Sequence, residues 1–166
     1  MKADDVPFVL RETLHFMGYP YGSEADESVL KLVEESALEM RAVLHPKLVY
    51  DEFPCEVIGD NESACGESGK CEKQIIKIGD FEIVSNDLAK NLSGCKSVIL
   101  FASTIGSEVD RLIKKYQKTD VAKAAVLQAT GAMFIESFVD TFNEKIKTET
   151  ETSGGKTKPR YSPGYG

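Results

Sequence analysis

The chain has 166 residues, which is enough for one domain with its own hydrophobic core. Its formal net charge of −7 argues against a protein that holds nucleic acid through phosphate contacts, because such proteins present a basic face. No apolar run reaches the roughly 18 residues of a membrane span, and the first residues lack the apolar core of a secretion signal. We therefore expect a cytoplasmic protein that binds neither nucleic acid nor membranes.

The N-terminal part shows helical patterns. Asp5 followed by Pro7 is typical of a helix start, and the apolar residues after them predict a short helix that ends at Gly18. A second helix is predicted to open near Asp26, because apolar residues then recur at three- and four-residue steps. We assign residues 5–45 to a helical part of a single α+β domain that spans residues 1–146.

Strand signals follow this helical part. Residues 48–57 are rich in β-formers, and residues 59–72 are polar with several Gly and Ser, which predicts a mobile loop. Residues 74–78 and 81–84 flank a Gly-Asp pair at Gly79, a strong hairpin signal. We therefore expect an antiparallel hairpin over residues 74–84.

A short helix and an apolar strand come next. Ser85 is a suitable N-cap for a helix that Gly94 closes. Residues 97–103 form a continuous apolar run, which predicts a central strand buried on both faces. A Thr-Ile-Gly sequence ending at Gly106 then leads into another helix, and we interpret it as a tight turn.

The longest helix is predicted from Asp120 to about Ile146. One stripe at helical spacing is small in its first half and acidic in its second, namely Ala125, Ala129, Ala132, Glu136, Asp140 and Asn143. Small residues let a ligand lie against the helix, and Glu136 emerges where such a ligand would end. The same pattern is also typical of a solvated face, on which Glu136 and Asp140 lie near Lys145.

The cysteines and histidines predict neither a metal site nor a catalytic centre. The spacing of the four cysteines, Cys55, Cys65, Cys71 and Cys95, does not match that of zinc or redox motifs, and free thiols are expected in a reducing cytoplasm. The sequence contains no GxSxG elbow, Walker A motif or HExxH motif. We therefore name no catalytic residue and no metal ligand.

The C-terminal part combines a polar segment with a specialised loop. Residues 147–158 are polar and are predicted to form a flexible linker. Residues 159–166, Pro-Arg-Tyr-Ser-Pro-Gly-Tyr-Gly, are predicted to form a ligand-binding loop. Arg160 can make a two-pronged contact to a carboxylate or phosphate, and Gly164 allows close approach of a backbone N–H. A C-terminal tail of turn residues without any partner would have the same composition.

Glu136 and Arg160 are the candidate binding pair. A carboxylate and a guanidinium on facing elements suit a zwitterionic amino acid, with Arg160 on the α-carboxylate and Glu136 on the α-ammonium group. The backbone at Ser162 and Gly164 can bond an adenine or ribose, and Tyr165 can cover the ligand. A Glu–Arg salt bridge without a ligand would explain the same two residues.

The order of these motifs resembles the S-adenosylmethionine-binding activation (reactivation) domain of cobalamin-dependent methionine synthase, in its short stand-alone version. Residues 97–110, Ser-Val-Ile-Leu-Phe-Ala-Ser-Thr-Ile-Gly-Ser-Glu-Val-Asp, resemble that family's central strand and the turn into its next helix. Residues 120–140 resemble its long helix, with Glu136 in Phe-Ile-Glu-Ser-Phe-Val-Asp. Residues 160–165 resemble its Arg-x-x-x-Gly-Tyr ligand loop.

The resemblance implies a C-shaped α+β domain with a twisted antiparallel sheet, flanking helices and a long buried C-terminal helix. S-adenosylmethionine would bind in a shallow groove. Arg160 would hold its carboxylate, Ser162 and Gly164 would contact it through the backbone, Tyr165 would line the sulfonium, and Glu136 would face the amino group. The implied function is that of a methyltransferase component that helps remethylate cobalamin on a methionine synthase or other corrinoid protein, with a flavodoxin-type reductant.

Three departures from the family accompany this resemblance. Tyr165 is followed by Gly166, where full-length synthases have Pro and a Cys-Pro segment. A further acidic ligand residue has no match, and the family continues with more strand and helix, so we expect the chain to be cut short. Because the corrinoid-binding DxHxxG segment is missing, the protein would act in trans. The alternatives are an adaptor that docks on a corrinoid protein without binding the methyl donor, and an S-adenosylmethionine sensor.

Overall fold

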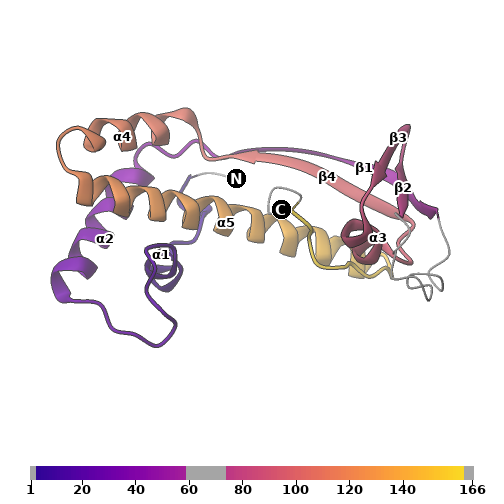
Figure 1. The fold of residues 1–166 in the computed structure, drawn as a ribbon, viewed down its shortest axis with the longest axis horizontal. Helices are drawn as coiled ribbons and strands as arrows, with labels where there is room; N and C mark the ends of the chain where they lie inside the picture. The colour runs from indigo at the N-terminus through magenta and orange to yellow at the C-terminus, as the bar shows by residue number, and fades with distance from the viewer. Residues whose placement is uncertain (1–2, 59–73, 163–166) are drawn as a thin grey trace, which may run out of the picture. The chain divides into compact units, whose positions relative to one another are not determined.

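The computed structural model describes residues 3–58 and 74–162, and its elements are labelled in Figure 1. These residues form an α+β fold with a four-stranded antiparallel sheet and a long C-terminal helix, which confirms the fold class predicted from the sequence. The elements in chain order are η1 (Ala3–Asp5), α1 (Leu10–Phe16), α2 (Glu27–Arg41), β1 (Lys47–Ile58), β2 (Ile75–Ile78), β3 (Phe81–Val84), α3 (Asn86–Leu92), β4 (Ser97–Thr104), α4 (Ser107–Gln117) and α5 (Val121–Thr152).

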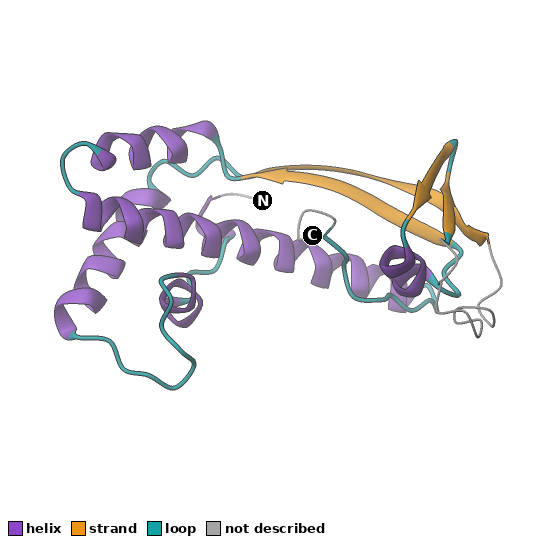
Figure 2. Ribbon diagram, in the orientation of Figure 1, coloured by secondary structure: helices purple, strands orange, loops and turns teal. Residues whose placement is uncertain are grey.

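The chain divides into two compact units. The single domain predicted over residues 1–146 stays a prediction. The first unit contains Met1–Val49 and Ala102–Thr148, and the second contains Tyr50–Phe101 and Glu149–Gly166. The first unit is mainly helical, whereas the second holds the β2–β3 hairpin, α3 and most residues of β1 and β4 (Figure 2). Each unit has its own buried apolar cluster, so each is described separately.

Helix α5 supplies much of the core of the first unit. Its side chains Leu127, Met133 and Phe134 are fully buried. They form one cluster with apolar residues of α2 and α4, namely Ala37, Met40, Val109 and Leu112. Full burial of one such large apolar side chain contributes about 1.5–3 kcal/mol. Buried positions occur from Ala124 to Val139, which confirms that much of this helix is enclosed.

The first helix begins later than the sequence predicted. Asp5 ends the short 3₁₀ turn η1, and α1 begins at Leu10 rather than beside Pro7. Val9, the residue before the helix, has an extended backbone and makes no side-chain capping bond. The predicted end is confirmed: α1 stops at Phe16, and Gly18 follows with a φ of 91°.

The sheet has the strand order β3-β2-β1-β4, with β1, β2 and β3 joined by antiparallel ladders. The predicted hairpin is present, and Gly79 takes a φ of 54° between its two strands. The predicted cap of α3 is also present, because the Ser85 hydroxyl accepts a hydrogen bond from the Leu88 N–H at 3.2 Å. Ile76 and Ile78 of β2 and Ala89 and Leu92 of α3 form the buried cluster of this second unit.

Strand β4 is not the central, doubly buried strand that its apolar run predicted. It lies at one edge of the sheet that the described residues form. Leu100 and Phe101 keep 45% and 37% of their surface exposed. An apolar run favours an extended backbone, but it does not specify how many strands or helices will cover that strand.

Helix α5 starts as predicted and ends later. The Asp120 carboxylate accepts a hydrogen bond from the Lys123 N–H at 3.0 Å and caps the first turn. The predicted end was near Ile146, but the helix continues to Thr152, into the segment predicted to be a linker. It stops where Gly154 takes a φ of 78° and the N–H groups of Gly154 and Gly155 bond back to the last turn. The polar residues 147–152 contain no Gly or Pro to end the helix earlier.

The predicted mobile loop at residues 59–72 lies outside the described residues.

Candidate functional site

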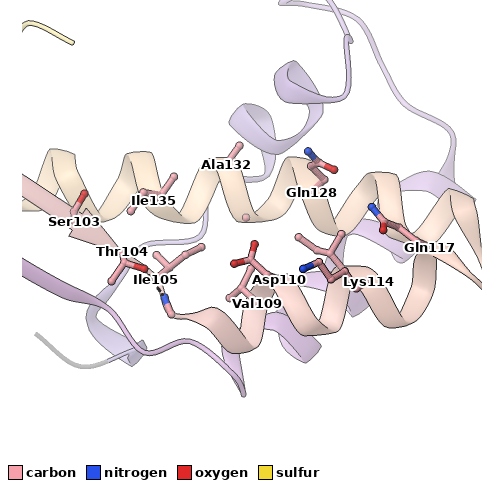
Figure 3. Close-up of a pocket in the computed structure, with 13 residues that line it drawn as sticks. Ser103, Thr104, Ile105, Val109, Asp110, Lys114, Gln117, Gln128, Ala132 and Ile135 are labelled. Carbon is pink, nitrogen blue, oxygen red and sulfur yellow. Dashed lines mark hydrogen bonds between the residues drawn. The ribbon is translucent and has the colours of Figure 1, made fainter. Parts of the chain in front are cut away.

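A groove of about 560 Å³ lies in the first unit, between the β4–α4 junction, α4 and α5 (Figure 3). Residues 103–106 line it at the end of β4. Helix α4 contributes Val109, Asp110, Ile113, Lys114 and Gln117, and helix α5 contributes Gln128, Gly131, Ala132 and Ile135. The lining is therefore partly apolar and partly polar, as is usual for small-molecule sites.

The β4–α4 junction has a backbone conformation and close packing that favour a glycine at position 106. Gly106 has a φ of 100°, which side-chain-bearing residues rarely adopt. An added Cβ there would lie 3.0 Å from the Cβ of His45. The His45 N–H donates to the carbonyl of Ile105 at 2.8 Å, and the Gly106 N–H donates to the Thr104 hydroxyl at 3.1 Å, drawn dashed in Figure 3. The prediction of a tight turn at this place is confirmed.

Small residues of α5 form one side of the groove. Gly131 is buried against Val109 of α4 and Met40 of α2, where an added Cβ would lie 3.6–3.7 Å from their atoms. Ala132 beside it is half-buried and leaves space above the helix. The described lining ends at Ile135, the residue before the predicted ligand residue Glu136, which is half-buried.

Asp110 and Lys114 are the charged groups of this groove. They are one helical turn apart on α4, so their side chains lie on the same face, and Figure 3 shows both in the space between α4 and α5. A carboxylate can accept from an ammonium or a hydroxyl, and a lysine can donate to a carboxylate. The sequence did not single out either residue as part of a binding site. Their spacing placed them on one face of a predicted helix, but only the structure showed that α5 lies opposite that face.

The terminal segment belongs to the second unit and is held against α3. The Asn91 side-chain amide donates to the carbonyl of Pro159 at 3.2 Å. The Lys158 ammonium donates to the carbonyl of Ser93. The predicted ligand residues Arg160 and Ser162 are exposed. The other two, Gly164 and Tyr165, lie outside the described residues.

Glu136 and Arg160 fall in different units of the chain. Their joint contact with one ligand therefore stays a prediction, and so does the alternative of a direct salt bridge between them.

A second group of charged side chains in the first unit joins three helices. Glu39 of α2 accepts from the Tyr116 hydroxyl of α4 at 2.8 Å and pairs with Lys123 of α5 at 2.6 Å. Burial raises the pKa of Glu39, but the bonds from Lys123 and Tyr116 outweigh it and leave the pKa below its usual value. Each group has its partner, so we interpret this group as structural. Among residues 3–58 and 74–162, no group of three or more His, Cys, Asp or Glu residues is arranged so that it could hold a metal ion.

Comparison with known proteins gave no assignment: neither a protein-family model nor a curated protein sequence matches this chain. The helices in the described part of the chain are too short or too polar to cross a membrane.

Proposed function

We propose that this protein binds S-adenosylmethionine and supports reductive remethylation of a corrinoid methyltransferase in trans, in the cytoplasm. The main observation in support is that two of the three motifs that resemble the methionine synthase activation domain line one groove. Residues 103–110 belong to the strand-and-turn motif, and residues 128–135 belong to the long-helix motif. Two separate segments that resemble one family thus meet at one concave surface.

The groove suits a ligand of this class in size and chemistry. Its volume of about 560 Å³ lies within the roughly 300–1,000 Å³ range of small-molecule sites. Its apolar positions at Ile105, Ile113 and Ile135 can cover an adenine or the methionine chain, and Asp110 and Lys114 can form hydrogen bonds with polar groups of the ligand. These properties support an amino-acid-like nucleoside ligand.

In the proposed complex, Arg160 holds the α-carboxylate of the ligand and Glu136 faces its ammonium group. The backbone at Ser162 and Gly164 bonds the nucleoside or amino-acid part, and Tyr165 shields the sulfonium from water. S-adenosylmethionine supplies an activated methyl group, while the partner's cobalamin and a flavodoxin-type reductant supply the acceptor and the electron. The chain's own task is binding and orientation, so it needs no general base.

Calorimetry with the full chain tests this function. Heat of binding with S-adenosylmethionine and with S-adenosylhomocysteine is expected. Absence of heat with both ligands would contradict the proposal and favour the adaptor. Binding without methyl transfer, in a spectral assay with the corrinoid partner and a reductant, would instead favour the sensor.

A further inference from the structure

The two cysteines among the described residues lie on neighbouring segments of the second unit. Cys55 belongs to β1, and Cys95 lies in the turn between α3 and β4. The Cys55 N–H donates to the carbonyl of Lys96 at 3.1 Å. The backbone at Cys55 is therefore hydrogen-bonded directly to the residue next to Cys95.

The side chains of these cysteines also converge. The Cys55 thiol donates to the carbonyl of Cys95, with an Sγ–O distance of 3.8 Å. Both side chains are half-buried and pack against the same cluster, formed by Ile76, Ile78, Ala89 and Leu92. They therefore lie on one side of the sheet. The Cys55 sulfur lies 3.8 Å from the backbone of Cys95, so a disulfide requires that the Cys95 side chain turn toward that sulfur.

The electrostatics of Cys55 agree with this proximity. Burial is the main cause that raises its pKa, and the charge of Cys95 raises it further. The thiol of Cys55 is therefore protonated at neutral pH, and its reactions are expected to accelerate as the pH rises. Neither cysteine has a disulfide partner in the described part of the chain.

We propose that Cys55 and Cys95 are a redox pair that interconverts between two thiols and a disulfide. The oxidant is a small disulfide such as oxidised glutathione. One protein thiolate attacks it, forms a mixed disulfide and releases one reduced glutathione. The second protein thiolate then attacks the mixed disulfide, closes the Cys55–Cys95 bond and releases a second reduced glutathione. Two thiol protons leave to solvent or to the departing thiolates, and excess reductant reverses both steps.

The Cys55–Cys95 disulfide would affect the region that contacts the C-terminal segment. It would join β1 to the turn that follows α3, and that turn begins at Ser93, whose carbonyl accepts the Lys158 ammonium. Oxidation would thus fix the part of the second unit that contacts Lys158 and Pro159. This proposal stands on the cysteine geometry alone and does not depend on the proposed ligand.

The test uses the full chain with Cys65 and Cys71 replaced by serine, because those two cysteines lie outside the described residues and provide competing thiols. Treatment with oxidised glutathione at pH 8 is expected to remove both remaining thiols from a thiol titration. Peptide mapping without reductant should recover Cys55 and Cys95 in one linked fragment. The urea midpoint of unfolding should rise on oxidation and return after reduction.

Matched single replacements and the natural chain complete the experiment. In the same background, Cys55→Ser and Cys95→Ser should each show neither the internal link nor the rise in the urea midpoint. Two free thiols that persist under oxidising conditions, or links only between separate chains, would overturn the proposal. Mapping of the natural chain that pairs Cys55 with Cys65 or Cys71 instead would also overturn it.

Discussion

Lys123 Nζ lies 2.6 Å from Glu39 Oε2 and joins the start of the long helix α5 to α2. The Tyr116 hydroxyl of α4 donates to the same carboxylate at 2.8 Å, and Lys123 donates to that hydroxyl at 3.2 Å. The side chains of Lys123 and Glu39 are only 18% and 29% exposed to solvent. Three helices of the first unit therefore meet at one hydrogen-bonded group.

Replacement of Lys123 by methionine should destabilise the protein by about 1–2 kcal/mol, because it leaves the Glu39 carboxylate partly buried without its cation. Urea unfolding measures this loss. The matched control is Lys115→Met. Lys115 Nζ is 4.0 Å from Glu39 Oε1 and its side chain is 65% exposed, so a change of no more than about 0.5 kcal/mol is expected. Equal losses for the two variants would contradict the structural role of Lys123.

The same group gives the stability a defined pH dependence. The pKa of Glu39 is lowered in the folded protein, so its contribution is present above its usual value of 4.5 and disappears as the pH falls below it. The pKa of Lys123 is raised, chiefly by the bond to Glu39, so its contribution is present below 10.5 and is lost at higher pH. The stability gap between the natural chain and Lys123→Met should therefore shrink at both extremes. A gap that stays constant from pH 3 to pH 7 would contradict this assignment.

Gly106→Ala should cost about 1–3 kcal/mol, because the φ of 100° disfavours a side chain and the added Cβ would press on His45. Thermal or urea unfolding measures the change. Gly131→Ala is the matched control with the opposite expectation. Its added Cβ would make ordinary contacts, and alanine favours the helix, so neutral or slightly increased stability is expected. If both variants lose stability equally, the β4–α4 junction is less constrained than the structure indicates.

Ala132→Leu should obstruct the groove between α4 and α5. Because Ala132 is half-buried and lines the groove, a larger side chain there should weaken S-adenosylmethionine binding at least ~10-fold while changing stability by less than about 1 kcal/mol. Calorimetry and urea unfolding report the two quantities separately. Ala122→Leu places the same side chain on an exposed position of α5 and should leave the affinity unchanged. Normal affinity of Ala132→Leu would place the ligand elsewhere.

Arg160→Ala should weaken binding of S-adenosylmethionine by at least ~2 kcal/mol, through loss of a charge-assisted two-pronged contact. Calorimetry measures the change, and Lys156→Ala removes a positive charge from the same exposed segment as a control. Glu136→Gln should have a smaller effect. An unchanged affinity for Arg160→Ala would remove this arginine from the site, and no effect of Glu136→Gln would favour a salt bridge or a solvated face.

The predictions that the structure confirms concern short-range interactions. Ser85 caps α3 and Gly79 turns the β2–β3 hairpin, both as the sequence indicated, and α5 begins next to Asp120, where the sequence placed its start. Each of these features depends on residues only a few positions apart. The end of α5 lies later than predicted, but it also depends on a local feature, because Gly154 closes the helix and no earlier residue does.

By itself, the amino-acid sequence determined the α+β class and most of the helix and strand starts, because backbone preferences and capping bonds act within a few residues. Only the tertiary structure decided that β4 lies at a sheet edge, that Gly106 packs on His45, that α4 and α5 enclose a groove, and that Cys55 lies beside Cys95. These relationships depend on how separate elements pack, and some, such as Gly106 with His45, join segments that are far apart in the chain. They arise from how apolar surfaces pack together, and no local pattern specifies that packing.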